Sequence, residues 1–159
     1  MPTFDAMRSL ELKVPPPAVA LLFGFLMWLA SSQAGPLAVS FGPRVPVALV
    51  LACLGLVCGI SGMLTFWRAK TTMNPIKLAA TSSLVTAGPY RFTRNPMYLS
   101  LLLYLLAWAV HLSNLLALLF LPVFVLYMNR FQIEPEERVL SSLFGPQYAA
   151  YRERVRRWL

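Results

Sequence analysis

Two polar segments of the sequence hold residue types and spacings that suit the binding of a charged ligand. The first is Gly88–Tyr98, which contains a Gly-Pro turn, two arginines and two tyrosines. It ends on Asn95 and Pro96, an N-cap residue followed by a proline suited to the first helical position. A helix starting there would direct free N–H groups toward an anion. The simpler alternative is a membrane-edge anchor, with arginines on lipid phosphates and tyrosines at the interface.

The second segment is acidic and lies in the C-terminal part of the chain. A Glu-Pro pair at 134–135 predicts a helix start, and Glu136 and Glu137 follow it directly. Carboxylates at a helix start stabilise the macrodipole, which is a sufficient structural explanation for them. They are equally suited to bind a ligand's ammonium group or ribose hydroxyls. Asn129 and Arg130 precede the acidic pair and are placed to line the same pocket.

Other common kinds of site are not indicated. The sequence has no HExxH, GxSxG, GxGxxG or P-loop motif, which excludes the common hydrolase, Rossmann and nucleotide-hydrolysing sites. Cys53 and Cys58 are five residues apart in one apolar block and would point in different directions on a helix. We therefore infer neither a disulfide nor a metal site. The single histidine, His111, is expected at the membrane interface.

The elements that must position the two polar segments are membrane helices. The apolar fraction is 58% and the charged fraction 13%, against about 45–50% and about 25% in soluble domains. The apolar residues come in blocks, which favours helices over an outer-membrane barrel. We predict an all-α polytopic membrane protein of one domain. Its four expected transmembrane helices are about 17–34, 45–66, 96–112 and 115–130, with a loop at 67–95 and a helical tail at 131–159.

Two of the apolar blocks carry further signals. The competing interpretation of the first block is a signal peptide, because residues 32–34 make a passable cleavage site. The second block has glycines at positions 55, 59 and 62, a stripe that lets a neighbouring helix approach closely. A short turn at 111–114 makes the third and fourth helices an antiparallel hairpin.

The tail is soluble in character. Gly145-Pro146 should break its helix. Beyond the break, aromatic and aliphatic residues recur at three- and four-residue spacing and form a stripe that lies either on the membrane or on the body of the protein. This stripe consists of Tyr148, Tyr151, Val155 and Trp158.

The basic residues set the expected topology. With four helices, the N-terminus, the 67–95 loop and the tail share one face and carry all but one of the 14 Lys and Arg residues; the exception is Arg44. The positive-inside rule places both termini and the loop in the cytoplasm, in an inner or plasma membrane. The net charge of +8 then points to anionic membrane lipids rather than nucleic acid as a partner, with the arginine run 152–157 as a lipid contact.

The two polar segments together resemble a known family. The run Gly88–Tyr98, the pair Glu136-Glu137 and a later Phe-Gly, Tyr, Tyr, Val series resemble the isoprenylcysteine carboxyl methyltransferase family, which is related to the membrane phospholipid methyltransferases. The family signature Arg-His-Pro-x-Tyr corresponds here to residues 94–98, with Asn95 in place of histidine. Asparagine donates and accepts hydrogen bonds but does not titrate near neutrality. The resemblance covers roughly residues 70–159.

The resemblance implies a methyltransferase whose two polar segments enclose S-adenosylmethionine on the cytoplasmic side. It also implies a lateral opening through which a lipid-like or prenylated acceptor enters from the bilayer. Glu136 or Glu137 would bind the cofactor's ammonium or ribose, and Arg94 with the helix-start amides its carboxylate. Arg130, which would orient an anionic acceptor, and Asn129 are the catalytic candidates. The cofactor-binding candidates are Gly88, Tyr90, Arg94, Asn95, Pro96, Tyr98, Glu136 and Glu137.

Three functions follow from this sequence. Carboxylate O-methylation is favoured, because a carboxylate nucleophile needs no general base and the sequence shows none. A phospholipid amine N-methyltransferase is the alternative, and its acceptor would lose a proton to water or to a glutamate. A non-catalytic membrane protein with a basic lipid-binding tail would explain the charge distribution. It would not explain why an acidic pair faces the same compartment as the Gly-Pro-Tyr-Arg turn.

Overall fold

The computed structural model describes residues 11–33, 42–69 and 83–159. Residues 70–82 of the expected loop and Ala34 of the possible cleavage site lie outside the described residues. The described residues form helices and no strand, which confirms the all-α class. The elements in chain order are α2 (Pro16–Gln33), α3 (Arg44–Arg68), η3 (Gly88–Arg91), α4 (Pro96–Leu112), α5 (Leu115–Met128), η4 (Asn129–Ile133) and α6 (Glu134–Arg154).

The length and composition of the helices suit a bilayer. α2, α3 and the merged helix Leu115–Arg154 are long and apolar enough to cross a membrane, and α4 is a shorter apolar helix. Large apolar side chains such as Leu21, Val57 and Leu126 are exposed on these helices. Exposed apolar surface of this kind matches lipid rather than water as the surrounding solvent. The chain is therefore a polytopic α-helical membrane protein, as predicted, and its described residues contain four apolar helices.

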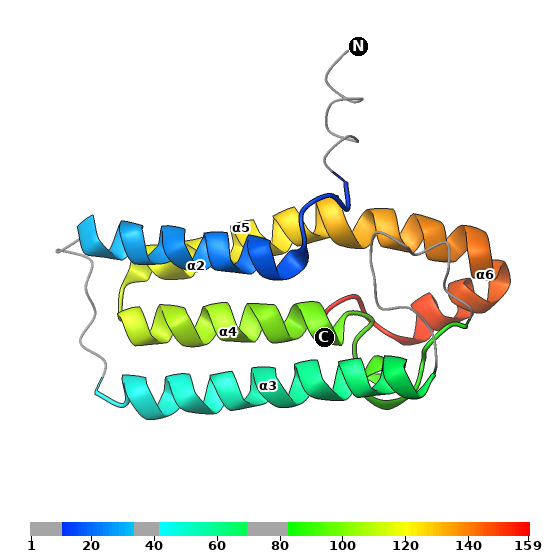
Figure 1. Cartoon of the computed structure of the whole chain (residues 1–159), viewed down its shortest axis with the longest axis horizontal. Helices are drawn as coiled ribbons and strands as arrows, with labels where there is room; N and C mark the ends of the chain where they lie inside the picture. Colours follow the sequence, from blue (N-terminus) through cyan, green and yellow to red (C-terminus); the bar gives the residue numbers. More distant parts are fainter. Residues whose placement is uncertain (1–10, 34–41, 70–82) are drawn as a thin grey trace, which may run out of the picture.

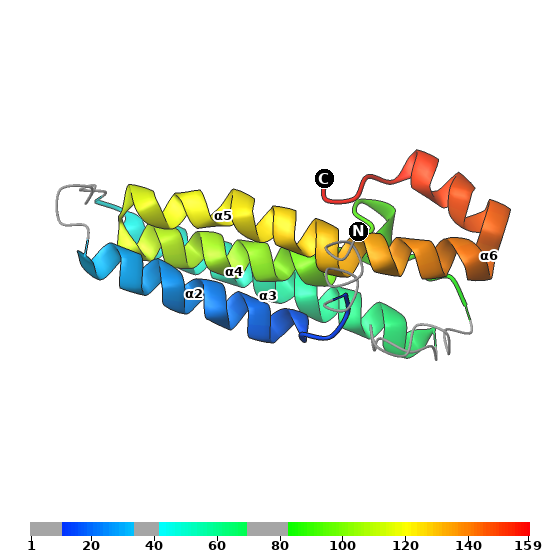
Figure 2. The same cartoon turned by 90° about the horizontal axis from the view of Figure 1, so that it is seen from above.

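The four apolar helices lie side by side, with α4 between α3 on one side and α2 and α5 on the other (Figures 1 and 2). η3, α6 and the C-terminal segment gather at the end of the bundle where α3 finishes and α4 begins. α2 also starts at this end, beside the junction of α5 and α6. We call this the polar end. Both polar segments singled out in the sequence are located there.

The apolar core lies where α2, α4 and α5 face one another. Phe23 and Met27 of α2 and Phe124 and Met128 of α5 are all buried in one cluster. The rings of Phe23 and Phe124 meet edge to face with 5.4 Å between centroids, a favoured aromatic geometry. This packing fixes α2 and α5 relative to α4, and so fixes the two helix ends that approach the polar end.

α3 packs on α4 through the glycine stripe that the sequence predicted. A Cβ added at Gly59 would lie 3.0 Å from Ser100 Oγ, and one added at Gly55 would lie 3.2 Å from Ser100 O. Farther along, a Cβ at Gly62 would lie 3.2 Å from Met97 Cγ. Side chains on these glycines would therefore separate the two helices. The stripe positions the start of α4, which carries half of the candidate site.

The hairpin of α4 and α5 has the expected turn. Ser113 takes the left-handed conformation with φ of 50°, which ends α4. Asn114 then caps α5, its side-chain oxygen accepting a hydrogen bond from Leu116 N at 2.9 Å. Both positions match the turn predicted at 111–114.

The junction of α5 and α6 differs from the prediction. A helix end near residue 130 and a fresh start at Glu134 were expected, but the helix continues through η4, a π-helical turn in which Glu134 N donates to Asn129 O. Pro135 explains the altered register, because it has no N–H to offer the carbonyl of Phe131 four residues earlier. The expected break at Gly145 is present, with φ of 46° inside α6.

The residues after this break pack on the protein. Tyr148, Tyr151 and Val155 are buried together, with Leu84, Leu140 and Phe144 packed against them. The C-terminal stripe thus covers the body of the protein, which decides between the two placements that the sequence left open.

Candidate functional site at the polar end of the bundle

The site is built around one ion pair that joins the two polar segments. Arg94, just before α4, donates from Nη2 to Oε1 of Glu137 in the first turn of α6 at 2.9 Å. Both side chains are largely buried, with 11% and 9% of their surfaces exposed. Charges this far from water interact more strongly than surface charges and are costly to leave unpaired. The pair therefore holds the start of α4 against the start of α6.

A second arginine completes the cluster from the C-terminal segment. Arg157 Nη2 donates to Glu137 Oε2 at 2.7 Å, and its Nε donates to Oε1 at 3.2 Å. The hydrogen bonds to this carboxylate raise the pKa of Arg157. The sequence predicted a lipid contact for Arg157, whereas the structure pairs its guanidinium with Glu137. One carboxylate thus joins three segments that are distant in sequence.

The C-terminal backbone is bound directly against the start of α4. Arg94 N donates to Arg156 O at 2.9 Å. Asn95 Nδ2 donates to Arg157 O at 2.9 Å, and Thr93 Oγ1 donates to the same oxygen at 3.2 Å. The Asn95 side chain makes no capping hydrogen bond to α4. The prediction of Asn95 as a side-chain N-cap is therefore wrong, because its amide is engaged by the C-terminal segment instead.

A partly buried acid–phenol pair lies beside this cluster. The Tyr98 hydroxyl donates to Oε1 of Glu136. Burial raises the pKa of the Glu136 carboxyl to about 7, the hydrogen bond from Tyr98 opposes this shift, and the neighbouring charge of Glu137 adds to it. Near neutral pH both the protonated and the ionised forms of this carboxyl are therefore populated. The two adjacent glutamates differ: Glu137 balances arginines, whereas Glu136 can hold or accept a proton.

Tyr90 and Tyr151 connect η3 to the tail. The Tyr151 hydroxyl donates to Tyr90 O at 2.7 Å, and burial raises the pKa of both phenols. In the part of the chain that the structure describes, the Tyr90 hydroxyl and Arg94 Nε are buried without a hydrogen-bond partner. Buried polar atoms in folded proteins are normally satisfied. Two unsatisfied atoms beside one ion-pair cluster are therefore positions where a bound polar ligand would gain hydrogen bonds.

A polar pocket opens next to Glu137. Its volume is about 380 Å³, and it is lined by Glu134, Glu137, Arg138, Ser141 and Arg152. Ligand pockets usually measure about 300–1,000 Å³. Carboxylates, guanidinium groups and a hydroxyl thus face one cavity that can take a ligand carrying both charges.

The two catalytic candidates lie outside this cluster. Asn129 Oδ1 accepts a hydrogen bond from Trp158 Nε1 at 3.0 Å. Arg130 Nη1 donates to Glu11 Oε1 at 2.7 Å, and Arg138 binds the other oxygen of the same carboxylate. Because Arg138 also lines the polar pocket, Arg130 is linked to the pocket through Glu11 and Arg138 rather than by direct contact.

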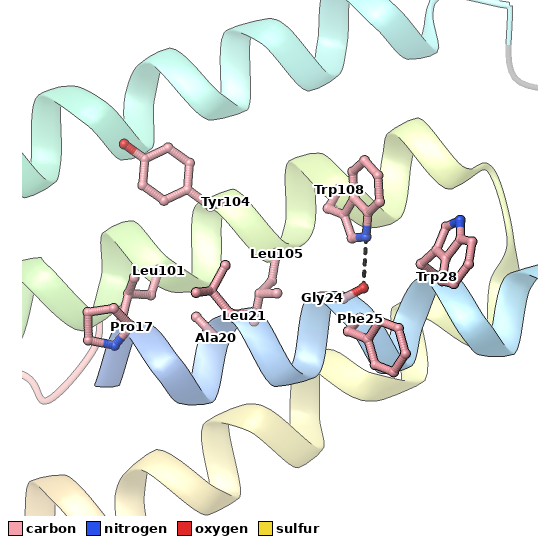
Figure 3. Close-up of a pocket in the computed structure, with 10 residues that line it drawn as sticks. All are labelled: Pro17, Ala20, Leu21, Gly24, Phe25, Trp28, Leu101, Tyr104, Leu105 and Trp108. Carbon is pink, nitrogen blue, oxygen red and sulfur yellow. Dashed lines mark hydrogen bonds between the residues drawn. The ribbon is translucent and has the colours of Figure 1, made fainter. Parts of the chain in front are cut away.

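An apolar groove lies between α2 and α4 within the membrane region (Figure 3). Its volume is about 740 Å³, and Leu21, Trp28, Leu101 and Tyr104 are among the residues that line it. Trp108 and Gly24 also line the groove, and Trp108 Nε1 donates to Gly24 O across the two helices at 3.0 Å. Leu101 lies one helical turn after Tyr98 on α4, so the groove begins close to the Tyr98–Glu136 pair.

The remaining predicted residues lie around the cluster. Gly88 begins η3 and is exposed, and Pro96 is buried at the first position of α4. The sequence did not indicate Glu11, Ser141, Arg152 or Arg157 as site residues. A signal existed only for Glu11, since carboxylates are scarce in a chain with 6 Asp and Glu against 14 Lys and Arg.

Comparison with known proteins identifies related methyltransferases. A family profile described as phospholipid methyltransferase matches residues 43–147. Protein-S-isoprenylcysteine O-methyltransferase B of Arabidopsis thaliana is 30% identical over 107 residues, 67% of this chain and 54% of its own length. The Schizosaccharomyces pombe protein-S-isoprenylcysteine O-methyltransferase is 29% identical over 108 residues, 68% of this chain and 46% of its own.

This chain therefore spans about half the length of those methyltransferases. An uncharacterized protein of Haemophilus influenzae is 56% identical over 63 residues, which is 40% of this chain and all of that protein. No solved structure matches the chain. The matched region includes α3, η3, α4, α5 and the glutamate pair of α6. The chain belongs to the family of membrane methyltransferases that includes the phospholipid and isoprenylcysteine methyltransferases.

Proposed function

We propose that the chain is an S-adenosylmethionine-dependent methyltransferase that methylates a lipid-like or prenylated acceptor, with a carboxylate as the favoured acceptor group. The reaction takes place at the cytoplasmic face of an inner or plasma membrane, with both termini in the cytoplasm. One observation carries the proposal: the Arg94–Glu137–Arg157 cluster brings the two family segments together beside a polar pocket. A chain with only a lipid-binding tail has no need of this open pocket lined by both signs of charge.

The residues present fit S-adenosylmethionine. Bound there, it would supply a methyl group on a sulfonium already activated for in-line displacement. Glu137 is suited to the ammonium group or ribose hydroxyls, and Arg94 is suited to the carboxylate. The unsatisfied Tyr90 hydroxyl and Arg94 Nε offer further hydrogen bonds. The cluster has both signs of charge that a zwitterionic amino-acid moiety requires.

The acceptor would reach this site from the bilayer. The groove between α2 and α4 offers about 740 Å³ of apolar space and begins one helical turn from Tyr98. A lipid chain in the groove would bring its reactive end toward the polar end of the bundle, where Arg130 is suited to orient a carboxylate. Holding the nucleophile in line and excluding water is the main contribution such a site makes to methyl transfer.

One observation favours an amine acceptor as the second candidate. Glu136 is buried against Tyr98, and its pKa is raised to about 7. A carboxylate with this property can take a proton from an ammonium group near neutral pH. The amine nitrogen would then attack with its lone pair, and the proton would remain on Glu136 Oε1. The Tyr98–Glu136 pair thus supplies the general base that the sequence alone did not show.

The test is incubation of the purified full chain with donor labelled in its methyl group and a total lipid extract. We expect label in a lipid fraction, with an alkali-labile product for a methyl ester and an alkali-stable product for a methylated amine. Glu137→Gln should abolish transfer, and Glu153→Gln, which removes the same charge from an exposed position, should not. Absence of label in every lipid fraction and absence of donor binding would overturn the proposal.

A further inference from the structure

The N-terminal segment 11–15 is attached to the polar end by contacts that the proposed function does not use. Leu12 N donates to Phe131 O at 3.1 Å, and Gln132 Nε2 donates to Val14 O at 2.8 Å. Glu11 binds Arg130 and Arg138 with its two carboxylate oxygens. These bonds hold a short stretch of chain across the α5–α6 junction.

The sequence explains why the N-terminal segment binds at Phe131. In a regular α-helix the carbonyl of Phe131 would accept from residue 135, but Pro135 has no N–H. The Leu12 amide donates to this carbonyl instead. Leu12 has φ of 58°, a conformation that costs an L-residue energy and persists only when its contacts impose it. The segment is therefore held at a defect of the helix, where its own backbone is strained.

Glu11 occupies a place that suits an external anion. Its side chain is only 12% exposed and bridges two guanidinium groups, the arrangement that proteins use to bind carboxylates and phosphates. Arg138 also lines the polar pocket beside Glu137. While Glu11 is bound, its carboxylate occupies Arg130 Nη1 and Arg138 Nη2, the donors that a headgroup bridging the two arginines would use.

We propose that Glu11 is a specificity-determining residue that competes, as an internal carboxylate, with the acceptor's anionic group for Arg130 and Arg138. This inference rests on the proposed function, because it takes the acceptor to bind at Arg130. An acceptor with a carboxylate or phosphate displaces Glu11 and releases the segment 11–15. A neutral lipid leaves the segment in place. The strained Leu12 turn lowers the cost of this release.

The first experiment uses the parent protein, full length, in detergent and without methyl donor. Dodecanoate supplies a carboxylate, dodecyl phosphate supplies a phosphate, and monododecanoyl glycerol is the neutral control. We expect the two anionic amphiphiles to increase hydrogen exchange in the peptide that contains Leu12, and the neutral one to leave it unchanged. Equal exchange with all three amphiphiles would overturn the inference.

The second experiment compares variants by binding of the same amphiphiles. Glu11→Gln should lower the Kd for at least one anionic amphiphile about tenfold and leave the Kd for monododecanoyl glycerol unchanged. Glu153→Gln removes the same charge from an exposed site and should change neither. Adding Arg130→Gln to Glu11→Gln should cancel the gain. The anionic amphiphile whose Kd falls more in Glu11→Gln identifies the preferred headgroup as a carboxylate or a phosphate.

The two proposals fail separately. Unchanged anion binding in Glu11→Gln overturns the role of Glu11, even if labelled lipid is formed. A gain in anion binding supports it, even if no methyl group is transferred. If Glu11→Gln does not fold, the exchange experiment on the parent protein still decides the matter, since it needs no substitution.

Discussion

Two regions of this molecule are stabilised in opposite ways: the contact between α3 and α4 inside the membrane, which we call the seam, and the polar end. The seam between α3 and α4 depends on missing side chains: Gly55, Gly59 and Gly62 let two helices come within van der Waals contact. The polar end depends on added charge: Glu137 binds Arg94 and Arg157 from two other segments. The seam and the polar end meet at the start of α4. This part of the chain packs closely against α3, and Arg94 just before it forms an ion pair with Glu137.

Because the seam depends on close packing and the polar end on ion pairs, we expect the two regions to respond differently to substitution, pH and salt. Close packing in lipid has little tolerance for added volume and does not respond to pH or salt. An ion-pair cluster at the membrane surface can be shared with a charged ligand and responds to both. We therefore expect substitutions in the seam to alter stability alone. Substitutions at the polar end should alter stability and ligand binding together.

The largest effect is expected from Glu137→Gln. It leaves Arg94 and Arg157 without their carboxylate, and removing one partner of a buried pair costs about 3–5 kcal/mol. Donor binding should be lost in the same variant. Denaturation in detergent and calorimetric titration with S-adenosylmethionine measure the two effects.

Glu153→Gln is the control for Glu137→Gln, because Glu153 is exposed on the same helix. If Glu137 served only the helix macrodipole, its loss would cost roughly 0.3–1 kcal/mol. A small loss of stability with unchanged donor affinity would show that the cluster neither holds the segments together nor binds the cofactor.

Glu136→Gln tests the other glutamate through pH. The folded protein raises the Glu136 pKa from 4.5 to about 7, so between these values the native state binds a proton that the unfolded state releases. This contribution to stability is present below about pH 4.5 and is lost as pH rises toward 7, by roughly 3 kcal/mol at most. The difference between the parent and the variant should therefore vary with pH across this window. Parallel stability profiles for the two proteins would contradict the burial of this carboxyl.

A smaller loss is expected in the seam. Gly59→Ala would place a Cβ 3.0 Å from Ser100 Oγ, and overpacking of this kind costs about 1–3 kcal/mol. Val57 is 66% exposed on the same helix, and Val57→Leu should be neutral. Donor affinity, measured on the folded fraction, should be unchanged in both. A loss of affinity in Gly59→Ala at full stability would mean that the seam and the site are not separate as described.

The sequence predicted the membrane region better than the polar end, for a physical reason. Apolar blocks and capping residues act locally, so the bounds of α4 and the turn through Asn114 could be derived from neighbouring residues. The pairing of Arg94 with Glu137 was less accessible, since 43 residues separate them. The predicted topology placed their two segments on the same face of the membrane, and the family resemblance brought them into one site.

Two features of the polar end were not predicted from the sequence. The π-helical turn at Asn129–Ile133 arises because Pro135 removes a donor while the apolar faces on both sides favour one continuous helix. The arginine run looked like a lipid contact because nothing in its own sequence shows that the chain turns back toward Glu137. Long-range pairing decided the position of the arginine run, and it is also the source of the error about Asn95.

Asn95 provides the last and smallest test, because the capping prediction and the structure rank its variants differently. As an N-cap, Asn95→Asp would equal the parent and Asn95→Ala would lose about 1 kcal/mol. In the structure Asn95 Nδ2 instead donates to Arg157 O at 2.9 Å. Asn95→Ala then loses one hydrogen bond, about 1 kcal/mol, and Asn95→Asp loses more, because its carboxylate would face a carbonyl oxygen. Asn95→His, the residue of the family signature, keeps an N–H donor and should remain closest to the parent. Denaturation of the three variants in detergent gives the order, and an aspartate variant as stable as the parent would restore the capping role.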